Sequence, residues 1–294
     1  MNLEDWVELS KTSHILHVRD MGLETLPELP PTLEQLWCEH NELIELPELP
    51  TSLTILFCDS NRLETLPQLP NRLEMLECSE NPLTSLPPLP DSLTNLFCDN
   101  SQLTSLPPLP PNLSVLRCSN NQLTTLQLPA NLNMLDCDSN RLTSLPPLPE
   151  TIDRIDCRYN QIRTLPFLPD SLMEFDAFQN PLQEPFRSLY DRFEEDEDIE
   201  QFKRSVNYYL SEQKRRANIR QNARNLRSLS LHAKQDLGNL PNDMRLHIGT
   251  ILSGKTGPTT RNQLAKLHVE HNMYGPRKQR KTRKTRKTRK QRKN

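Results

Sequence analysis

Glycine, aromatic residues and long apolar runs are all scarce in this chain of 294 residues, which has 6 glycines and an aromatic content of 5%. No apolar run reaches the length that a membrane-spanning helix needs. The first residues, MNLEDWVELSKT, are acidic and mixed, so they lack the basic start and apolar core of a secretory signal. We therefore expect no membrane association and an intracellular location, in the cytoplasm of the cell or of a host cell, with the nucleus as a second compartment.

The net charge of -2 conceals two halves of opposite sign. Residues 1–181 contain 9 Lys and Arg against 26 Asp and Glu, whereas residues 182–294 contain 27 against 12. The chain is therefore strongly dipolar, and its two halves are expected to attract partners of opposite charge.

Proline is abundant, with 26 residues, and nearly all of them recur at fixed intervals before residue 170. A unit of about 20 residues begins at Leu23, Leu43 and Leu63 and recurs eight times through Ile162, with one copy, at Leu123, shorter by a residue. The pattern L-x-x-L-x-C-x-x-N-x-L alternates apolar and variable positions, as a short strand with one buried face requires. The x-L-P-x-L-P stretch excludes a helix, because its prolines remove backbone donors and favour extended geometry before them. The sequence predicts an α/β repeat fold: a curved solenoid with a parallel sheet on its concave face and an extended or 3₁₀ convex side.

These residues also carry a family resemblance. L-x-x-L-x-C-x-x-N-x-L is similar to the leucine-rich-repeat consensus, and the LPxLPxxL half resembles its shortest class. That class occurs in bacterial type III-secreted effectors and in related repeat proteins of bacteria and large DNA viruses. The resemblance covers a little over half the chain and implies the solenoid fold, but a shared fold does not fix a shared activity.

Two columns of the repeat are interpreted as structural. A buried Asn after each strand can offer donors and acceptors to the backbone of neighbouring turns, and Ser101 interrupts this column. The cysteines are odd in number, share one inward position and have no His in their column, so packing is favoured over a disulfide, metal or redox role. We expect no metal and no cofactor. The cysteines are Cys38, Cys58, Cys78, Cys98, Cys118, Cys137 and Cys157.

The ends of the solenoid should be capped, because its core is otherwise exposed. We predict an N-terminal cap at 1–12, the solenoid at 13–182, a helical region at 183–274 and a disordered basic tail at 275–294. The side chains expected to cover the last turn are Leu182, Phe186, Leu189 and Phe193.

The variable positions beside the inward Leu and Cys should project from the concave face. The N-terminal part of these columns is aromatic and aliphatic, the C-terminal part is charged, and carboxylates form a rim. Exposed aromatic residues on a rigid sheet are typical of a protein-binding surface, and the acidic rim favours a basic partner; packing of these side chains on one another is the alternative. The predicted partner-binding residues are Gln35, Trp37, Glu39, Ile55, Phe57, Asp59, Met75, Phe97, Asp99, Val115, Arg117 and Asp136.

Residues 240–252 resemble the start of an F-box, in which an LP pair begins a helix with an aliphatic stripe. The resemblance implies an adaptor that recruits a target to a host ubiquitin ligase, whereas a plain packed helix is the alternative. The residues that carry it are Leu240, Pro241, Met244, Ile248, Ile251 and Leu252.

From Gly275 the chain is basic and has no apolar core residues, so it cannot pack. Such a run binds nucleic acid or another acidic surface, directs nuclear import, or contacts the acidic solenoid. The candidate contacts are Arg277, Lys278, Arg280, Lys281, Arg283, Lys284, Arg286, Lys287, Arg289 and Lys290.

No catalytic arrangement is recognisable. Secreted effectors of this repeat class sometimes end in a cysteine-dependent ubiquitin ligase domain, but no Cys follows Cys157. The run Ser253-Gly-Lys-Thr-Gly lacks the leading glycine and strand of a phosphate-binding loop. The sequence therefore predicts a non-catalytic protein-interaction module, with a ligase adaptor or a nucleic-acid-associated structural protein as alternatives. It leaves the oligomeric state open.

Overall fold

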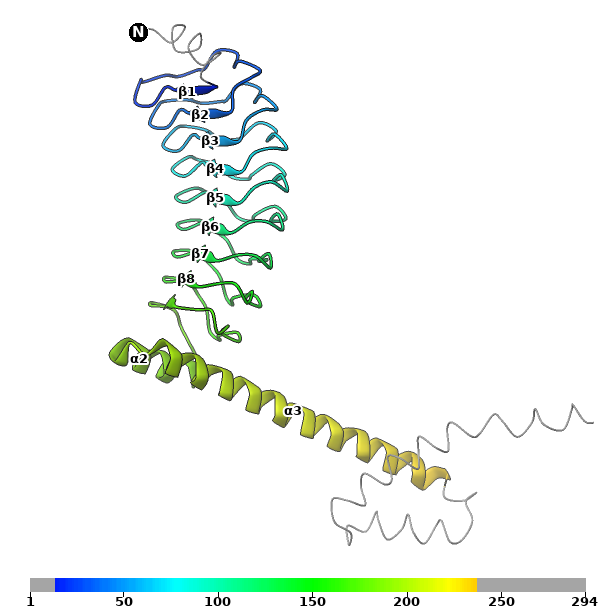
Figure 1. Cartoon of the computed structure of the whole chain (residues 1–294). Coiled ribbons are helices and arrows are strands. Elements are labelled where there is room, and N and C mark those ends of the chain that lie inside the picture. Colours follow the sequence, from blue (N-terminus) through cyan, green and yellow to red (C-terminus); the bar gives the residue numbers. More distant parts are fainter. Residues whose placement is uncertain (1–13, 237–294) are drawn as a thin grey trace, which may run out of the picture. The chain divides into compact units, whose positions relative to one another are not determined.

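The computed structural model of the chain describes residues 14–236. Nine three-residue strands form one parallel sheet in chain order, stacked one above the next (Figure 1). The predicted solenoid is confirmed. The strands are β1 (Ile15–His17), β2 (Gln35–Trp37), β3 (Ile55–Phe57), β4 (Met75–Glu77), β5 (Asn95–Phe97), β6 (Val115–Arg117), β7 (Met134–Asp136), β8 (Arg154–Asp156) and β9 (Glu174–Asp176).

The repeat length sets the register of the sheet. Leu36 pairs with Leu56, one full repeat further on, and Leu116 pairs with Leu135 where the short repeat removes a residue. Equivalent positions of successive repeats therefore form straight columns. Between β1 and β9 the connections are extended segments and turns without a helix, as the paired prolines predict.

The central Leu of each strand and the following Cys point into the core. Leu36, Leu56 and Cys58 are completely buried, and the other members of both columns are similar. Burying each Leu contributes about 1.5–3 kcal/mol relative to leaving it exposed. Burial raises the pKa of the Cys58 thiol, which leaves it a poor nucleophile. The Cys column therefore packs the core, as predicted.

An asparagine ladder ties the turns together. The Asn41 Nδ2 group donates to the carbonyls of Val18 (2.8 Å) and Cys38 (3.0 Å), and its Oδ1 accepts from the amides of Met21 and Leu23 (both 3.0 Å). Because these partners lie in two successive turns, one buried amide holds both in register. Asn61, Asn81, Asn121, Asn140, Asn160 and Asn180 bond in the same way.

Ser101 interrupts the ladder. Its hydroxyl donates to the Asp99 carbonyl at 3.4 Å, and within residues 14–236 it makes no hydrogen bond to the preceding turn. The hydroxyl is too short to reach the backbone groups that an Asn would bond there. The turn between β5 and β6 therefore lacks this cross-link.

Two helices follow the last strand, α2 (Phe186–Asp196) and α3 (Ile199–Asp236). The chain forms two compact units, Met1–Gln213 and Lys214–Asn294. In the first unit, Phe175 of β9 contacts Phe202 of α3 with 5.6 Å between ring centroids, and Phe202 stacks on Phe193 of α2 at 4.8 Å. Leu182 and Phe186 are buried, and Leu189 is partly buried against the core. The predicted side chains thus do cover the last turn.

Lys203 of α3 replaces a group that a further repeat would supply. In the interior, the Ser52 hydroxyl donates to the carbonyls of Pro31 (3.0 Å) and Leu33 (2.6 Å) in the preceding turn. At the last turn, the buried Lys203 Nζ donates to the equivalent carbonyls of Asp170 (2.8 Å) and Leu172 (2.9 Å), and it pairs with Glu200 at 2.5 Å. The ammonium group therefore closes the convex side of the turn.

Tyr190 of α2 supplies a hydrogen-bond partner that a further strand of the sheet would provide. The Cys157 amide donates to the Asp176 carbonyl on the next strand at 2.8 Å. Ala177, at the equivalent place in the last turn, donates instead to the Tyr190 hydroxyl oxygen at 3.0 Å, and that hydroxyl donates to the Asp176 carboxylate at 2.9 Å. Two side chains thus supply the partners that a tenth turn would provide.

In the second unit, the described part is the continuation of α3, on which Lys214, Arg216, Arg220 and Arg224 are exposed. None of the helices within residues 14–236 is long and apolar enough to cross a lipid bilayer. The predicted N-terminal cap at 1–12, the F-box-like segment at 240–252 and the basic tail at 275–294 lie outside the described residues.

Restoring the ladder should stabilise the protein. In Ser101→Asn, two or more hydrogen bonds are regained, so we expect the free energy of unfolding to rise by about 1–3 kcal/mol, at about 1 kcal/mol for each bond. Urea denaturation followed by circular dichroism measures this change. Asn81→Ser should have the opposite effect, and equal stabilities for wild type and Ser101→Asn would contradict this account of the ladder.

Removing the Lys203 ammonium should weaken the C-terminal cap. In Lys203→Met the volume is retained, but the Asp170 and Leu172 carbonyls lose their donor, which costs about 1–3 kcal/mol. The exposed neighbour Arg204 offers a matched control, Arg204→Met. Hydrogen exchange should accelerate in the last turn of Lys203→Met alone; equal exchange in both variants would show that the ammonium does not hold that turn.

Candidate partner-binding face

The predicted partner-binding residues lie in three adjacent columns beside the inward Leu and Cys. Strand residues on either side of the central Leu are half-buried or exposed, in agreement with a sheet that has one solvent-facing side. The first column is Gln35, Ile55, Met75 and Val115, the second is Trp37, Phe57, Phe97, Arg117 and Asp136, and the third is Glu39, Asp59 and Asp99.

An apolar patch occupies the N-terminal half of this face. We define it as Trp37, Ile55, Phe57, Met75 and Phe97, all of which are half-buried. The rings of Trp37 and Phe57 pack edge to face with centroids 4.2 Å apart, a geometry that adds to simple burial. The side chains therefore support one another and still retain accessible surface.

Glu77 stands within the patch, because the register pairs it with Phe57 on one side and Phe97 on the other. Burial raises the pKa of Glu77 from 4.5 to about 7, hydrogen bonds from Ser79 oppose the rise, and the charge of Asp59 adds to it. A carboxylate that changes charge near neutral pH therefore lies among aromatic side chains. Glu77 is not among the contacts predicted from the sequence, because its raised pKa depends on burial, which the repeat pattern alone does not report.

The C-terminal half of the face carries ion pairs. Arg117 contacts the carboxylates of Asp99 (3.0 Å) and Asp136 (3.7 Å). Arg158 pairs with Asp156 at 2.6 Å and with Asp176 at 3.5 Å. Such partly exposed pairs add little stability individually, but they fix the positions of the charges.

Two predicted contact residues, Glu39 and Asp99, are buried rather than exposed, at 6% and 5%. Asp99 accepts a hydrogen bond from the Ser119 amide at 2.7 Å, and its own amide donates to the Ser79 hydroxyl at 2.9 Å. These bonds tie Asp99 to both neighbouring turns. Its carboxylate therefore contributes to the structure and also pairs with Arg117.

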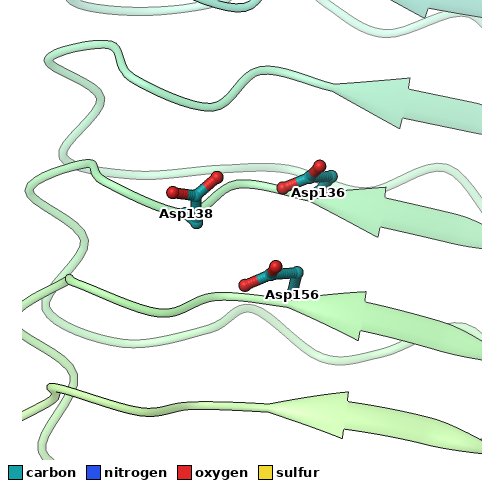
Figure 2. A group of neighbouring side chains, drawn as sticks. All are labelled: Asp136, Asp138 and Asp156. Atoms are coloured by element: carbon teal, nitrogen blue, oxygen red, sulfur yellow. The ribbon is translucent and has the colours of Figure 1, made fainter.

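Three carboxylates, those of Asp136, Asp138 and Asp156, lie close enough to offer oxygen ligands within 4.8 Å of one another (Figure 2). Each already has a partner: Ser119 donates to Asp136 at 2.5 Å, Ser139 donates to Asp138 at 2.8 Å, and Arg158 pairs with Asp156. Burial, together with the charges of the other two carboxylates, raises the pKa of Asp136. The group could hold a hard cation, but its existing donors explain the arrangement without one.

Neutralising Glu77 should change how stability depends on pH. Since its pKa is raised on folding, the folded chain binds this proton more tightly, and that stabilisation is lost as pH rises through about 7. Gln does not titrate. We expect the free energy of unfolding of Glu77→Gln, relative to that of wild type, to be higher at about pH 8 than at about pH 5. Urea denaturation at the two pH values measures this difference. A difference independent of pH would show that Glu77 titrates normally.

No protein-family model and no curated protein matches the sequence, so nothing in these comparisons supports the F-box resemblance of 240–252. Solved structures do match. A Shigella effector leucine-rich-repeat domain is 31% identical, with a TM-score of 0.50, over 67% of this chain and 83% of that one. YopM, a leucine-rich effector protein from Yersinia pestis, is 38% identical, with a TM-score of 0.56, over 60% of this chain.

The chain spans 52% of the Yersinia pestis YopM structure and 41% of YopM from Yersinia enterocolitica, to which it is 36% identical with a TM-score of 0.48. The chain belongs to the leucine-rich-repeat family that includes these bacterial effector proteins.

Proposed function

We propose that this protein is a non-catalytic binding module that holds a protein partner on its concave sheet face, inside a cell or host cell. The observation that carries the proposal is the apolar patch. The rings of Trp37 and Phe57 pack there with centroids 4.2 Å apart, and both side chains remain half-buried on paired strands of the sheet. Aromatic side chains of this kind dominate the binding energy of protein interfaces.

The rigidity of the sheet supports this function. The side chains of the patch belong to strands that the asparagine ladder holds, so a partner meets a surface that is already ordered. Little conformational entropy is then lost on binding, which favours affinity for a given contact area. Leucine-rich-repeat solenoids in general present such extended concave surfaces.

The lack of catalysis is inferred from the thiols and the charges. The thiol of Cys157, the last cysteine of the chain, is buried, and burial raises its pKa, which is the reverse of what a nucleophile needs. Several acidic residues of the concave face, among them Asp99, Asp136 and Asp156, are paired with arginines or with a hydroxyl, which suits fixed recognition. Contact of the basic tail with nucleic acid stays a separate prediction, on residues 277–290.

Removing the patch should abolish binding without unfolding the protein. A library of random 16-residue peptides (about four and a half turns of helix or some 50 Å extended) is selected on the full chain, and the selected peptides are measured by calorimetry. In Trp37→Ala/Phe57→Ala we expect at least a 10-fold loss of affinity, because hot-spot residues contribute about 2 kcal/mol or more.

The chain offers a matched control. Tyr159 and Phe178 form another edge-to-face pair, with centroids 6.0 Å apart, on exposed positions outside the patch. Tyr159→Ala/Phe178→Ala removes the same kind of side chains and should leave affinity unchanged. If both double variants bind like wild type while circular dichroism reports intact folds, the patch is not the binding surface.

A further inference from the structure

One buried carboxylate on the concave face lacks a complete set of partners. Glu39 is 6% exposed, and its Oε2 atom is buried without a hydrogen bond among the described residues. Its Oε1 atom lies 3.7 Å from an Arg19 nitrogen, which is too long for a hydrogen bond. An ionised oxygen buried without a donor costs more than a bonded one, so this position favours a cationic donor from outside.

Glu39 adjoins the apolar patch. It follows Trp37 by two residues in the alternating backbone, and it is in the same column as Asp59, whose pKa is raised by burial. A Lys or Arg side chain suits such a place, because its stem packs on an aromatic ring while its charged end meets a carboxylate.

A second place for a cation lies at the other end of the same face. Strands β7 to β9 and the α2–α3 turn enclose a corner pocket of about 470 Å³. Its apolar wall includes Met173, Phe193 and Ile199, and its acidic rim includes Glu174 and Glu197. An apolar wall with an acidic rim again matches an aliphatic stem that ends in a positive charge.

The arginines that line the corner pocket already have carboxylate partners. Arg154 pairs with Glu174 at 2.6 Å, and Arg158 pairs with Asp156 and Asp176. Asp136 and Glu197 also line the pocket, so its carboxylates outnumber its arginines. The excess negative charge favours a basic occupant and disfavours nucleic acid on this face.

We propose that the partner docks as an extended basic segment, with one Lys or Arg side chain at Glu39, apolar residues on the patch, and a second Lys or Arg side chain in the corner pocket. This rests on the proposed function and adds the chemistry of the partner. Six strand spacings separate β2 from β8, or about 29 Å at about 4.8 Å each. An extended chain covers that distance in about nine residues, which predicts the separation of the two basic positions.

The peptides selected on the wild-type chain test this composition directly. We expect them to contain two basic residues about nine positions apart around an apolar centre, and to lose at least 10-fold in affinity when either is replaced by citrulline, which has the shape of Arg without the charge. Selected peptides that lack Lys and Arg, or that tolerate citrulline at both places, overturn the proposal.

Variants of the protein separate a binding role from a structural one. Glu39→Gln removes an incompletely paired buried charge, so it should keep or raise the urea midpoint while weakening peptide affinity at least 10-fold. Glu45→Gln, on an exposed position, is its control. If Glu39→Gln lowers the midpoint and leaves affinity unchanged, Glu39 serves the fold through Arg19 and the proposal fails.

The corner pocket is tested by Glu197→Lys against Glu64→Lys, which changes net charge equally on an exposed position of a convex connection. Only Glu197→Lys should weaken binding by 10-fold or more. Equal affinities for these two variants overturn the corner pocket. If peptide affinity depends on Trp37 and Phe57 but not on Glu39 or Glu197, the proposed function stands and the basic segment is rejected. If peptide affinity depends on none of these four residues, both proposals are rejected.

Discussion

The asparagine that follows most of the strands is the interaction on which the rest of the structure depends. A three-residue strand cannot hold its own register, since it makes few hydrogen bonds and buries a single large side chain. The Asn side chain bonds the backbones of two successive turns at once, as Asn41 does with Val18 and Cys38. Registered turns place equivalent residues in columns, and the columns create both the core and the concave face.

The ends of such a stack present the same unsatisfied groups as every interior turn. At the C-terminal end, side chains of the following helices make the hydrogen bonds that a further turn would make. The Lys203 ammonium bonds the two carbonyls that a serine or threonine of a following turn would bond, and the Tyr190 hydroxyl accepts the amide that a following strand would accept. The helices α2 and α3 thus end the repeat by reproducing its hydrogen bonds as well as by covering its apolar side chains.

The concave face combines stabilising and destabilising features. Arg117 and Arg158 each hold two carboxylates in place, whereas Glu39 and Glu77 are partly or wholly buried without full compensation. Buried carboxylates that lack a full set of partners lower the stability of the free protein. They are expected at binding surfaces, where a partner can supply the missing contacts. Both lie in or beside the apolar patch, where the proposed partner would cover them.

The amino-acid sequence by itself determined the repeat, the strands and the inward columns, because the 20-residue period, the paired prolines and the alternation of apolar residues are local properties of the chain. It also placed Trp37 beside Phe57, since equivalent positions of successive repeats must be neighbours. Only the tertiary structure decided that Glu39 and Asp99 are buried, that Arg117 and Arg158 neutralise particular carboxylates, and that Lys203 and Tyr190 close the last turn. These outcomes depend on side-chain conformations and on distances between residues of different turns and helices, which no local pattern in the sequence encodes.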